Sequence, residues 1–249
     1  MRGDESQQLQ MRLRQEAMRA DKLYRSVPGR FVTGEERALA VHEARAVGVA
    51  VSFDGGWPDA ERVQVCFHPA DDEPEFTAVW VEIRWNAKFA HVDHRDLLGS
   101  LMGLGMDRAY MGDLIAQEDH AYLCVLPELA VRLPMEWTQA GRTTITVREL
   151  AGTPEIQRPE GQLLRDTVPS TRLDAVLASG MKLSRTKAAE YIRQGVVSVD
   201  HQTEERTDRQ LSEGQLLSIR GFGRIRLVEV GEPTRKDRLP VTLEIFKKG

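Results

Sequence analysis

A stretch rich in proline and glycine, residues 151–169, is the feature that most limits how this 249-residue chain can fold. No apolar period runs through it, and it contains Gly152, Pro154, Pro159, Gly161 and Pro169. Proline and glycine interrupt both helices and strands, so the segments on either side of such a stretch fold separately. We therefore predict a linker at 151–169 between two parts, each long enough to bury its own core.

The part before this linker predicts an α+β fold. Apolar residues at helical spacing indicate helices within residues 1–50, the second of which starts at Thr33 with Glu36 in the capping-box position. Residues 51–150 mix helical and alternating patterns, which indicates a middle domain with a mixed sheet. Its predicted strands are 63–67, 79–85, 113–115, 122–125 and 143–149. Its predicted helices are one between a cap at Asp93 and an end at Gly105, and one that starts at Pro127. Pro134 is expected to kink or end that last helix.

Residues 170–249 predict a short helix–turn–helix followed by a small sheet. The first helix starts at Leu173 and ends near Gly180, and Ser184 can cap the second. The buried face of the second helix is expected to be Ala188, Ala189 and Ile192, with Gly195 as its end. Short apolar runs predict strands at 196–199, 216–219 and 225–228.

Positive charge is concentrated in this last part. Residues 165–249 hold 16 Lys and Arg against 12 Asp and Glu, whereas the rest of the chain holds 18 against 26. A local positive surface on an acidic chain is what a phosphate-backbone partner requires, and cations around a helix N-terminus suit a phosphate. The candidate RNA-binding residues are Arg172, Lys182, Ser184, Arg185, Thr186, Lys187, Arg193, Arg220, Gly221, Phe222, Gly223 and Arg224. Aromatic side chains are scarce here, so structured RNA is a better partner than single strands.

These residues resemble the RNA-binding domain named after the fourth protein of the small ribosomal subunit, the S-four or S4 domain. The resemblance is carried by Arg172-Leu173-Asp174, Leu183-Ser184-Arg185-Thr186-Lys187-Ala188 and Ile192-Arg193-Gln194-Gly195-Val196-Val197. The chain departs from the family pattern at Asp200, where the family usually has asparagine before a turn. The resemblance implies an S4-type domain at residues 170–249.

Fragments further upstream resemble the YlmH family. They are the runs 55–62 (GGWPDAER) and 94–105 (HRDLLGSLMGLG), the pair Gly112-Asp113, and the turn 220–224 (RGFGR). The resemblance implies a cytoplasmic RNA-binding protein without enzymatic activity. It further implies association with the large ribosomal subunit and with tRNA on stalled, split ribosomes, in ribosome-associated quality control. We expect a monomer that binds rRNA or tRNA and needs no cofactor or metal.

The rest of the sequence agrees with a cytoplasmic location. Cys66 and Cys124 stand alone, as expected in a reducing compartment, and residues 1–11 lack the apolar core of a secretory signal. No run approaches the ~18 apolar residues that span a bilayer. No membrane partner is therefore expected.

Two other functions remain open at this point. Arg172-Leu173-Asp174 is similar to the catalytic segment of pseudouridine synthases, which makes an RNA-modifying enzyme the first alternative. That motif continues with threonine or serine where this chain has Leu177, so we expect Asp174 to pair with a neighbouring cation instead. A protein-interaction scaffold is the second alternative.

A metal site is a weaker hypothesis. Two histidines and two aspartates lie close together at the start of a predicted helix: His91, Asp93, His94 and Asp96. Residues of these types at a helix start more often cap the helix, and capping is what we expect of Asp93.

Overall fold

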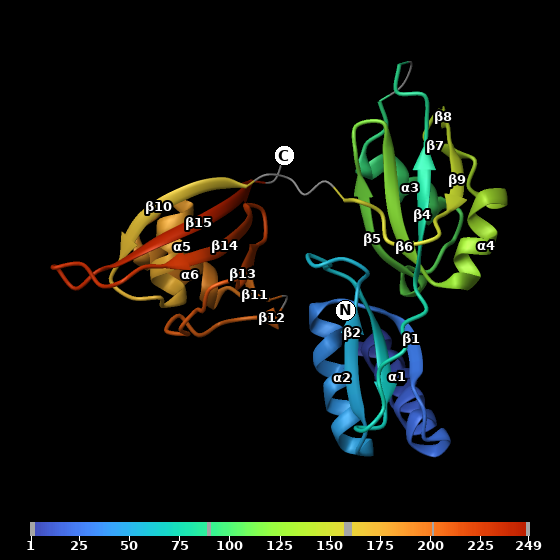
Figure 1. Ribbon diagram of the computed structural model, residues 1–249, viewed down its shortest axis with the longest axis horizontal. Coiled ribbons are helices and arrows are strands. Elements are labelled where there is room, and N and C mark those ends of the chain that lie inside the picture. Colours follow the sequence, from blue (N-terminus) through green and yellow to red (C-terminus); the bar gives the residue numbers. More distant parts are fainter. Residues whose placement is uncertain (1–2, 89–90, 157–160, 201, 248–249) are drawn as a thin grey trace. The chain divides into compact units, whose positions relative to one another are not determined.

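The computed structural model of the chain describes residues 3–88, 91–156, 161–200 and 202–247. The chain forms two compact units, residues 1–157 and 158–249. Among the described residues, no helix is both long enough and apolar enough to cross a membrane. Figure 1 shows the elements of each unit.

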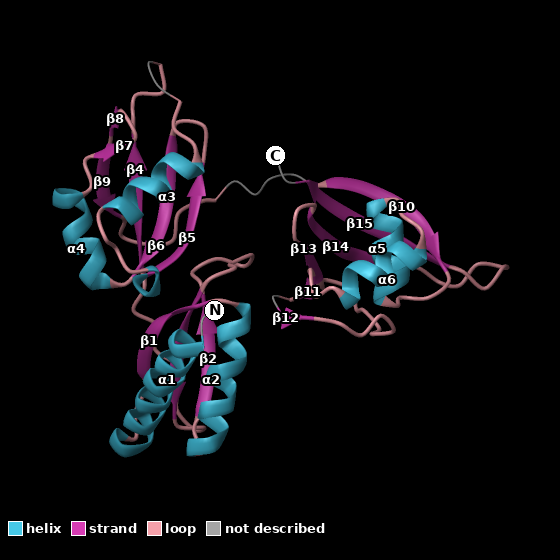
Figure 2. Cartoon of the chain, turned by 180° about the vertical axis from the view of Figure 1, so that it is seen from behind, coloured by secondary structure: helices cyan, strands magenta, loops and turns pink. Residues whose placement is uncertain are grey.

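The first half of the N-terminal unit is two helices on a small sheet. In chain order its elements are α1 (Gly3–Leu23), β1 (Val27–Val32), α2 (Gly34–Val47), β2 (Ala50–Asp54) and β3 (Val63–His68). The sheet is antiparallel, with the order β1-β3-β2. Leu13 and Ala17 of α1 and Ala40 of α2 are fully buried in one core with Val65 and Phe67 of β3. The two helices, which could bury little alone, thus pack on this sheet (Figure 2).

The second half of this unit is a second antiparallel sheet with two helices. Its elements are β4 (Val79–Arg84), α3 (His94–Gly103), the 3-10 turn η1 (Arg108–Tyr110), β5 (Met111–Ala116), β6 (His120–Val125), α4 (Pro127–Glu136), β7 (Gln139–Ala140), β8 (Thr143–Thr144) and β9 (Thr146–Glu149). Four strands form the sheet, in the order β5-β6-β4-β9, and β7 pairs with β8. Leu97 and Leu101 of α3 and Leu133 of α4 are buried in one core with Ile83 and Leu123.

The C-terminal unit is a helix pair on a six-stranded sheet. Its elements are β10 (Gln162–Val168), α5 (Leu173–Met181), α6 (Arg185–Arg193), β11 (Val197–Val199), β12 (Gln202–Thr203), β13 (Leu216–Ile219), β14 (Gly223–Val230) and β15 (Leu239–Lys247). The sheet order is β10-β15-β14-β13-β11-β12, and all its pairs are antiparallel. Leu173 and Leu177 of α5 and Ile192 of α6 pack with Ile225 and Leu243. Both helices lie on the same face of this sheet (Figure 2).

Two of the YlmH-like fragments meet within the N-terminal unit. The Asp113 carboxylate accepts hydrogen bonds from the Trp57 indole (3.0 Å) and from the backbone N–H groups of Glu61 (2.8 Å) and Arg62 (3.0 Å). A Cβ on Gly112 would lie 2.6 Å from the Phe31 ring, so only glycine fits there without a shift. These fragments therefore hold the segment after β2 against β5.

The α+β class predicted from the sequence is confirmed, and three details are corrected. The sheet expected to be mixed is antiparallel in every pair described. Residues 1–50, expected to be helical, also contain β1 and the first residue of β2, and β1 pairs with β3 much later in the chain. Within the predicted linker, residues 162–168 form β10, which pairs along its whole length with β15, while residues 157–160 lie outside the described part.

Capping predictions at two helix starts are also confirmed. The Thr33 N–H donates to the Glu36 carboxylate (2.6 Å), and Asp93 accepts from the N–H groups of Arg95 (2.7 Å) and Asp96 (2.9 Å). Pro134 does not end its helix at once, because α4 continues to Glu136. A proline so close to a helix end removes only one backbone hydrogen bond.

Candidate nucleic-acid interface

The start of α5 is fixed by the backbone of a later loop. The N–H of Leu173 donates to the Arg209 carbonyl (2.8 Å), and that of Asp174 donates to the Thr207 carbonyl (3.1 Å). The first N–H groups of a helix have no partner inside the helix, so these bonds satisfy them and leave no opening for a phosphate. Arg172 immediately precedes α5 and is half-buried.

Asp174 binds two of the predicted RNA-contacting arginines. Its carboxylate accepts hydrogen bonds from Arg172 (3.1 Å) and from Arg185 on α6 (2.8 Å). Burial would raise the pKa of the Asp174 carboxyl, but these hydrogen bonds and charges outweigh it and hold the pKa below its ordinary value. Two guanidiniums therefore share one negative charge, so the cluster keeps a net positive charge. The expected pairing of Asp174 with a neighbouring cation is confirmed.

The turn between α5 and α6 contains a lysine and, two residues later, a capping serine. Lys182 ends α5 in the left-handed conformation, with φ 55° and ψ 47°, and is exposed. Ser184 caps α6 as predicted, since its hydroxyl accepts from the Lys187 N–H at 3.3 Å. That bond uses one of the free N–H groups that would otherwise face a ligand.

The outer face of α6 is polar and exposed because its inner face is apolar. Ala188, Ala189 and Ile192 are buried, as predicted, and this turns the rest of the helix toward solvent. The predicted contact residues Arg185, Thr186, Lys187 and Arg193 are all exposed. Within the described part of the chain, Lys187 and Arg193 make no ion pair, so their charges are available to a partner.

The glycine-flanked turn between β13 and β14 does not join the start of α6. The Arg220 N–H donates to the carbonyl of Val196, which follows α6 closely. Since a nine-residue helix is roughly 13 Å long, the turn and Ser184 lie near opposite ends of α6. Gly221 and Gly223 have φ values of 85° and 133°, which explains the glycines.

The side chains of this turn point in different directions. Phe222 is half-buried and packs against the core of the unit, so it is a packing residue rather than an exposed stacking platform. The Arg224 guanidinium lies 5.9 Å from the centre of the Phe246 ring. Arg220 and Gly221 are exposed at the tip.

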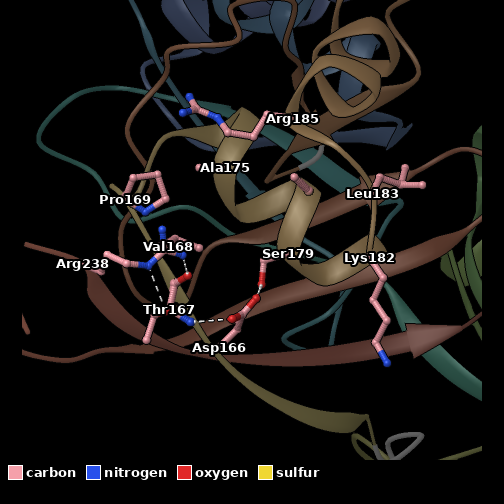
Figure 3. Close-up of a pocket in the computed structure, with 11 residues that line it drawn as sticks. Asp166, Thr167, Val168, Pro169, Ala175, Ser179, Lys182, Leu183, Arg185 and Arg238 are labelled. Atoms are coloured by element: carbon pink, nitrogen blue, oxygen red, sulfur yellow. Dashed lines mark hydrogen bonds between the residues drawn. The ribbon is translucent and has the colours of Figure 1, made fainter. Parts of the chain in front are cut away.

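A groove that the sequence did not reveal runs along α5. It encloses about 560 Å³ and is lined by Asp166, Thr167, Val168, Pro169, Ala175, Ala178, Ser179, Lys182, Leu183, Arg185 and Arg238 (Figure 3). Two predicted residues, Lys182 and Arg185, thus share it with Arg238, which lies just before β15. The cluster of basic residues at 235–238 was the only signal in the sequence that could have indicated Arg238.

Asp200, the departure from the S4 pattern, keeps a structural role. It adopts the left-handed conformation, with φ 48°, in the turn after β11. Its carboxylate accepts from the Leu216 N–H (2.9 Å) and from the Gln215 amide (2.7 Å). An aspartate can therefore replace asparagine here without loss of the turn.

Comparison with known proteins agrees with the two-unit description. Residues 71–153 match the family described as "Putative RNA-binding domain in YlmH", and residues 171–217 match the S4 domain. A curated relative, "Ribosome-associated protein quality control protein P2" of Bacillus subtilis (strain 168), is 34% identical over 218 residues, which cover 86% of this chain and 85% of the relative.

A solved structure is also similar, more distantly. "Cell division protein ylmH from Streptococcus pneumoniae" is 22% identical and covers 59% of this chain and 91% of its own, with a TM-score of 0.49.

Proposed function

This chain belongs to the YlmH family, and on that premise we propose that it is a non-enzymatic protein that binds structured RNA through phosphate contacts. The proposed RNA is rRNA or tRNA on the large ribosomal subunit, and the proposed setting is ribosome-associated quality control in the cytoplasm. The printed name of the Bacillus subtilis relative supports this setting. We propose that the protein acts as a monomer, without a metal or cofactor.

The proposed domains follow the same division. The S4-type domain at 170–249 is the main RNA-binding part, and the α+β domain at 51–150 is a second candidate because it overlaps the matched YlmH domain. The helical segment 1–50 and the linker 151–169, whose residues 162–168 form β10, complete the chain.

The observation that carries the proposal is the exposed cationic face of α6. Lys187 and Arg193 are exposed and make no ion pair with any described residue, and Lys182 at the preceding turn shares both properties. Cations that are exposed and not neutralised attract polyanions, and they release condensed counterions when they bind RNA. Arg172 and Arg185 add less, since Asp174 already offsets half of their charge.

The enzymatic alternative has little support at Asp174. A carboxylate that attacks a base must be accessible, yet Asp174 is 7% exposed and both of its oxygens accept hydrogen bonds from arginines. Replacement of this residue is therefore expected to disturb the fold of the unit rather than abolish a reaction.

Salt dependence of RNA binding tests the proposal. The affinity of the full chain for large-subunit rRNA and for bulk tRNA should fall with rising salt, by about 0.7–0.9 in log–log slope for each phosphate contact. For the double variant Lys187→Gln/Arg193→Gln, the slope of log affinity against log salt should be smaller by the amount expected for about two phosphate contacts. Both side chains are exposed, so their loss leaves no buried partner. Exposed substitutions of this kind seldom change stability by more than about 0.5 kcal/mol.

Arg165→Gln is the matched control. Arg165 is exposed on β10 and is not among the candidate residues, so its loss removes a positive charge of the same kind from the same unit, one charge against the two of the double variant. Equal binding by the parent and the double variant, at every salt concentration, would refute the proposed α6 surface.

A further inference from the structure

The groove along α5 exists because small side chains line its floor. Ala175, Ala178 and Ser179 lie on one face of α5, and the facing wall is the end of β10 with Pro169. Among the described residues no aromatic side chain lines the groove, and polar or charged residues make up about half of the lining. Sites for drug-like molecules are mainly apolar and aromatic, so this lining favours a charged ligand instead.

The charge of the groove is positive. The described lining contains three cationic residues, Lys182, Arg185 and Arg238, and one carboxylate, Asp166. That carboxylate already accepts hydrogen bonds from the Ser179 hydroxyl (2.6 Å) and the Thr167 N–H (2.7 Å). Arg238 and Lys182 make no ion pair with described residues, so both retain their full charge.

Arg238 is held in position without being neutralised. Its guanidinium donates to the Thr167 hydroxyl (3.1 Å) and to the Thr167 carbonyl, and its N–H donates to the Thr234 hydroxyl (3.2 Å). Both guanidinium acceptors are uncharged, and a guanidinium has five N–H donors, so several remain for a ligand. A cation fixed in this way loses little side-chain entropy when it binds.

The cations are distributed along the groove rather than gathered at one point. In Figure 3, Arg185 lies near one end of α5, Lys182 lies near the other, and Arg238 lies across from the helix beside Thr167. The seven-residue step from Ala175 to Lys182 corresponds to about 10 Å along α5. Cations spread along a groove in this way suit successive phosphates of one strand better than a single phosphate.

We propose that this groove binds the phosphodiester backbone of an RNA strand, with Arg238 as a contact residue outside the matched S4 segment of 171–217. The proposal rests on the proposed RNA-binding function and extends it to β10 and to the segment before β15. One strand would follow the groove along α5, and the cationic face of α6 would contact the RNA beyond it.

Arg238→Gln tests this assignment in the full chain, with large-subunit rRNA as the probe. Glutamine can still donate to the Thr167 carbonyl but carries no charge, so about a 5-fold loss of affinity and a smaller salt slope are expected. Arg238→Lys keeps the charge that neutralises a phosphate and should bind within about 2-fold of the parent. Arg165→Gln, whose side chain does not line the groove, should match the parent.

The outcomes separate this inference from the proposed function. If Arg238→Gln binds like the parent while the Lys187→Gln/Arg193→Gln variant is weakened, the groove is not an RNA site and the α6 surface stands. If the parent itself does not bind RNA, the proposed function fails and this inference fails with it. If thermal unfolding shows that Arg238→Gln is unstable, Arg238→Lys and Lys182→Gln take its place. Weaker RNA binding by Lys182→Gln, which loses a charge, together with unchanged binding by Arg238→Lys, which keeps it, would support the groove.

Competition by inorganic phosphate at matched ionic strength distinguishes a site for an RNA strand from a site for a free phosphate ion. A groove for a strand should show no more competition from phosphate than from chloride. Strong competition in the parent that disappears in Arg238→Gln would instead indicate a site for a free anion, and would overturn the assignment to RNA backbone.

Discussion

Lys182 combines an unfavourable backbone conformation with an exposed positive charge. Lys182 has a φ of 55°, in the left-handed region that residues other than glycine rarely adopt. Helices in many proteins end with a glycine in this conformation. The neighbouring helix end, at Gly195, follows that rule with φ 66°. A lysine at this point therefore costs stability, and its place in the groove offers a reason for the cost.

Lys182→Gly should raise stability and weaken RNA binding at the same time. The gain is about 1 kcal/mol in the free energy of unfolding, since glycine adopts this conformation without strain, and the loss is one phosphate contact. Urea unfolding followed by circular dichroism measures the first effect, and RNA titration at several salt concentrations measures the second.

Lys182→Ala is the matched comparison, because it removes the same charge and keeps the strain. It should bind RNA as weakly as the glycine variant without the gain in stability. A glycine variant that binds RNA like the parent would show that Lys182 serves only the turn.

At the scale of elements, local signals were sufficient for the helices and insufficient for several strands. Ser184 and the face of Ala188 and Ile192 predict α6 because capping and helical period involve neighbours in sequence. β10 is different, since its partner β15 lies some 80 residues later and its flanking prolines and glycines indicate a linker. β1 was missed for a similar reason, because its partner β3 lies about 30–40 residues later.

The candidate site was predictable in the same uneven way. Exposure of the α6 residues followed from the helical period, but the bonds from Arg172 and Arg185 to Asp174 required knowledge of how two helices meet. The position of Arg238 in the groove depends on the course of the chain between β14 and β15, which the sequence pattern does not predict. The distance between the β13–β14 turn and Ser184 could not be read from spacing either.

The contact between β5 and the segment after β2 gives a prediction at this scale. Asp113→Ala should lower the free energy of unfolding of the N-terminal unit by about 1–3 kcal/mol, because it leaves the N–H groups of Glu61 and Arg62 without this acceptor. Tryptophan fluorescence during urea unfolding reports the change, since Trp57 donates to the same carboxylate.

Glu118→Ala is a suitable control for that measurement, since Glu118 is an exposed acidic residue of the same unit, in the loop between β5 and β6. It should shift the transition much less. An Asp113 variant as stable as the parent would show that packing around Gly112, rather than the carboxylate, holds these segments together.

At the scale of the whole molecule, the two units can be monitored separately. All four tryptophans of the chain, Trp57, Trp80, Trp85 and Trp137, belong to the N-terminal unit. Tryptophan fluorescence therefore reports the unfolding of that unit, whereas far-ultraviolet circular dichroism reports both. This difference makes the proposed division into domains testable.

Leu177→Ala should destabilise the C-terminal unit alone. Leu177 is fully buried in α5, and loss of such a side chain costs about 2–5 kcal/mol. We expect part of the circular dichroism signal to be lost at lower urea concentration while the tryptophan transition stays in place. A tryptophan transition that moves equally would show that the chain unfolds as one cooperative body.

The order of strands in the C-terminal sheet has a consequence for synthesis. β15 lies between β10 and β14, yet the ribosome makes it after every other described strand of that sheet. Until it emerges, β10 has no neighbour and β14 presents an open edge, so a nascent chain cut short before Leu239 cannot close the sheet. Incomplete copies should therefore be recognised and degraded readily.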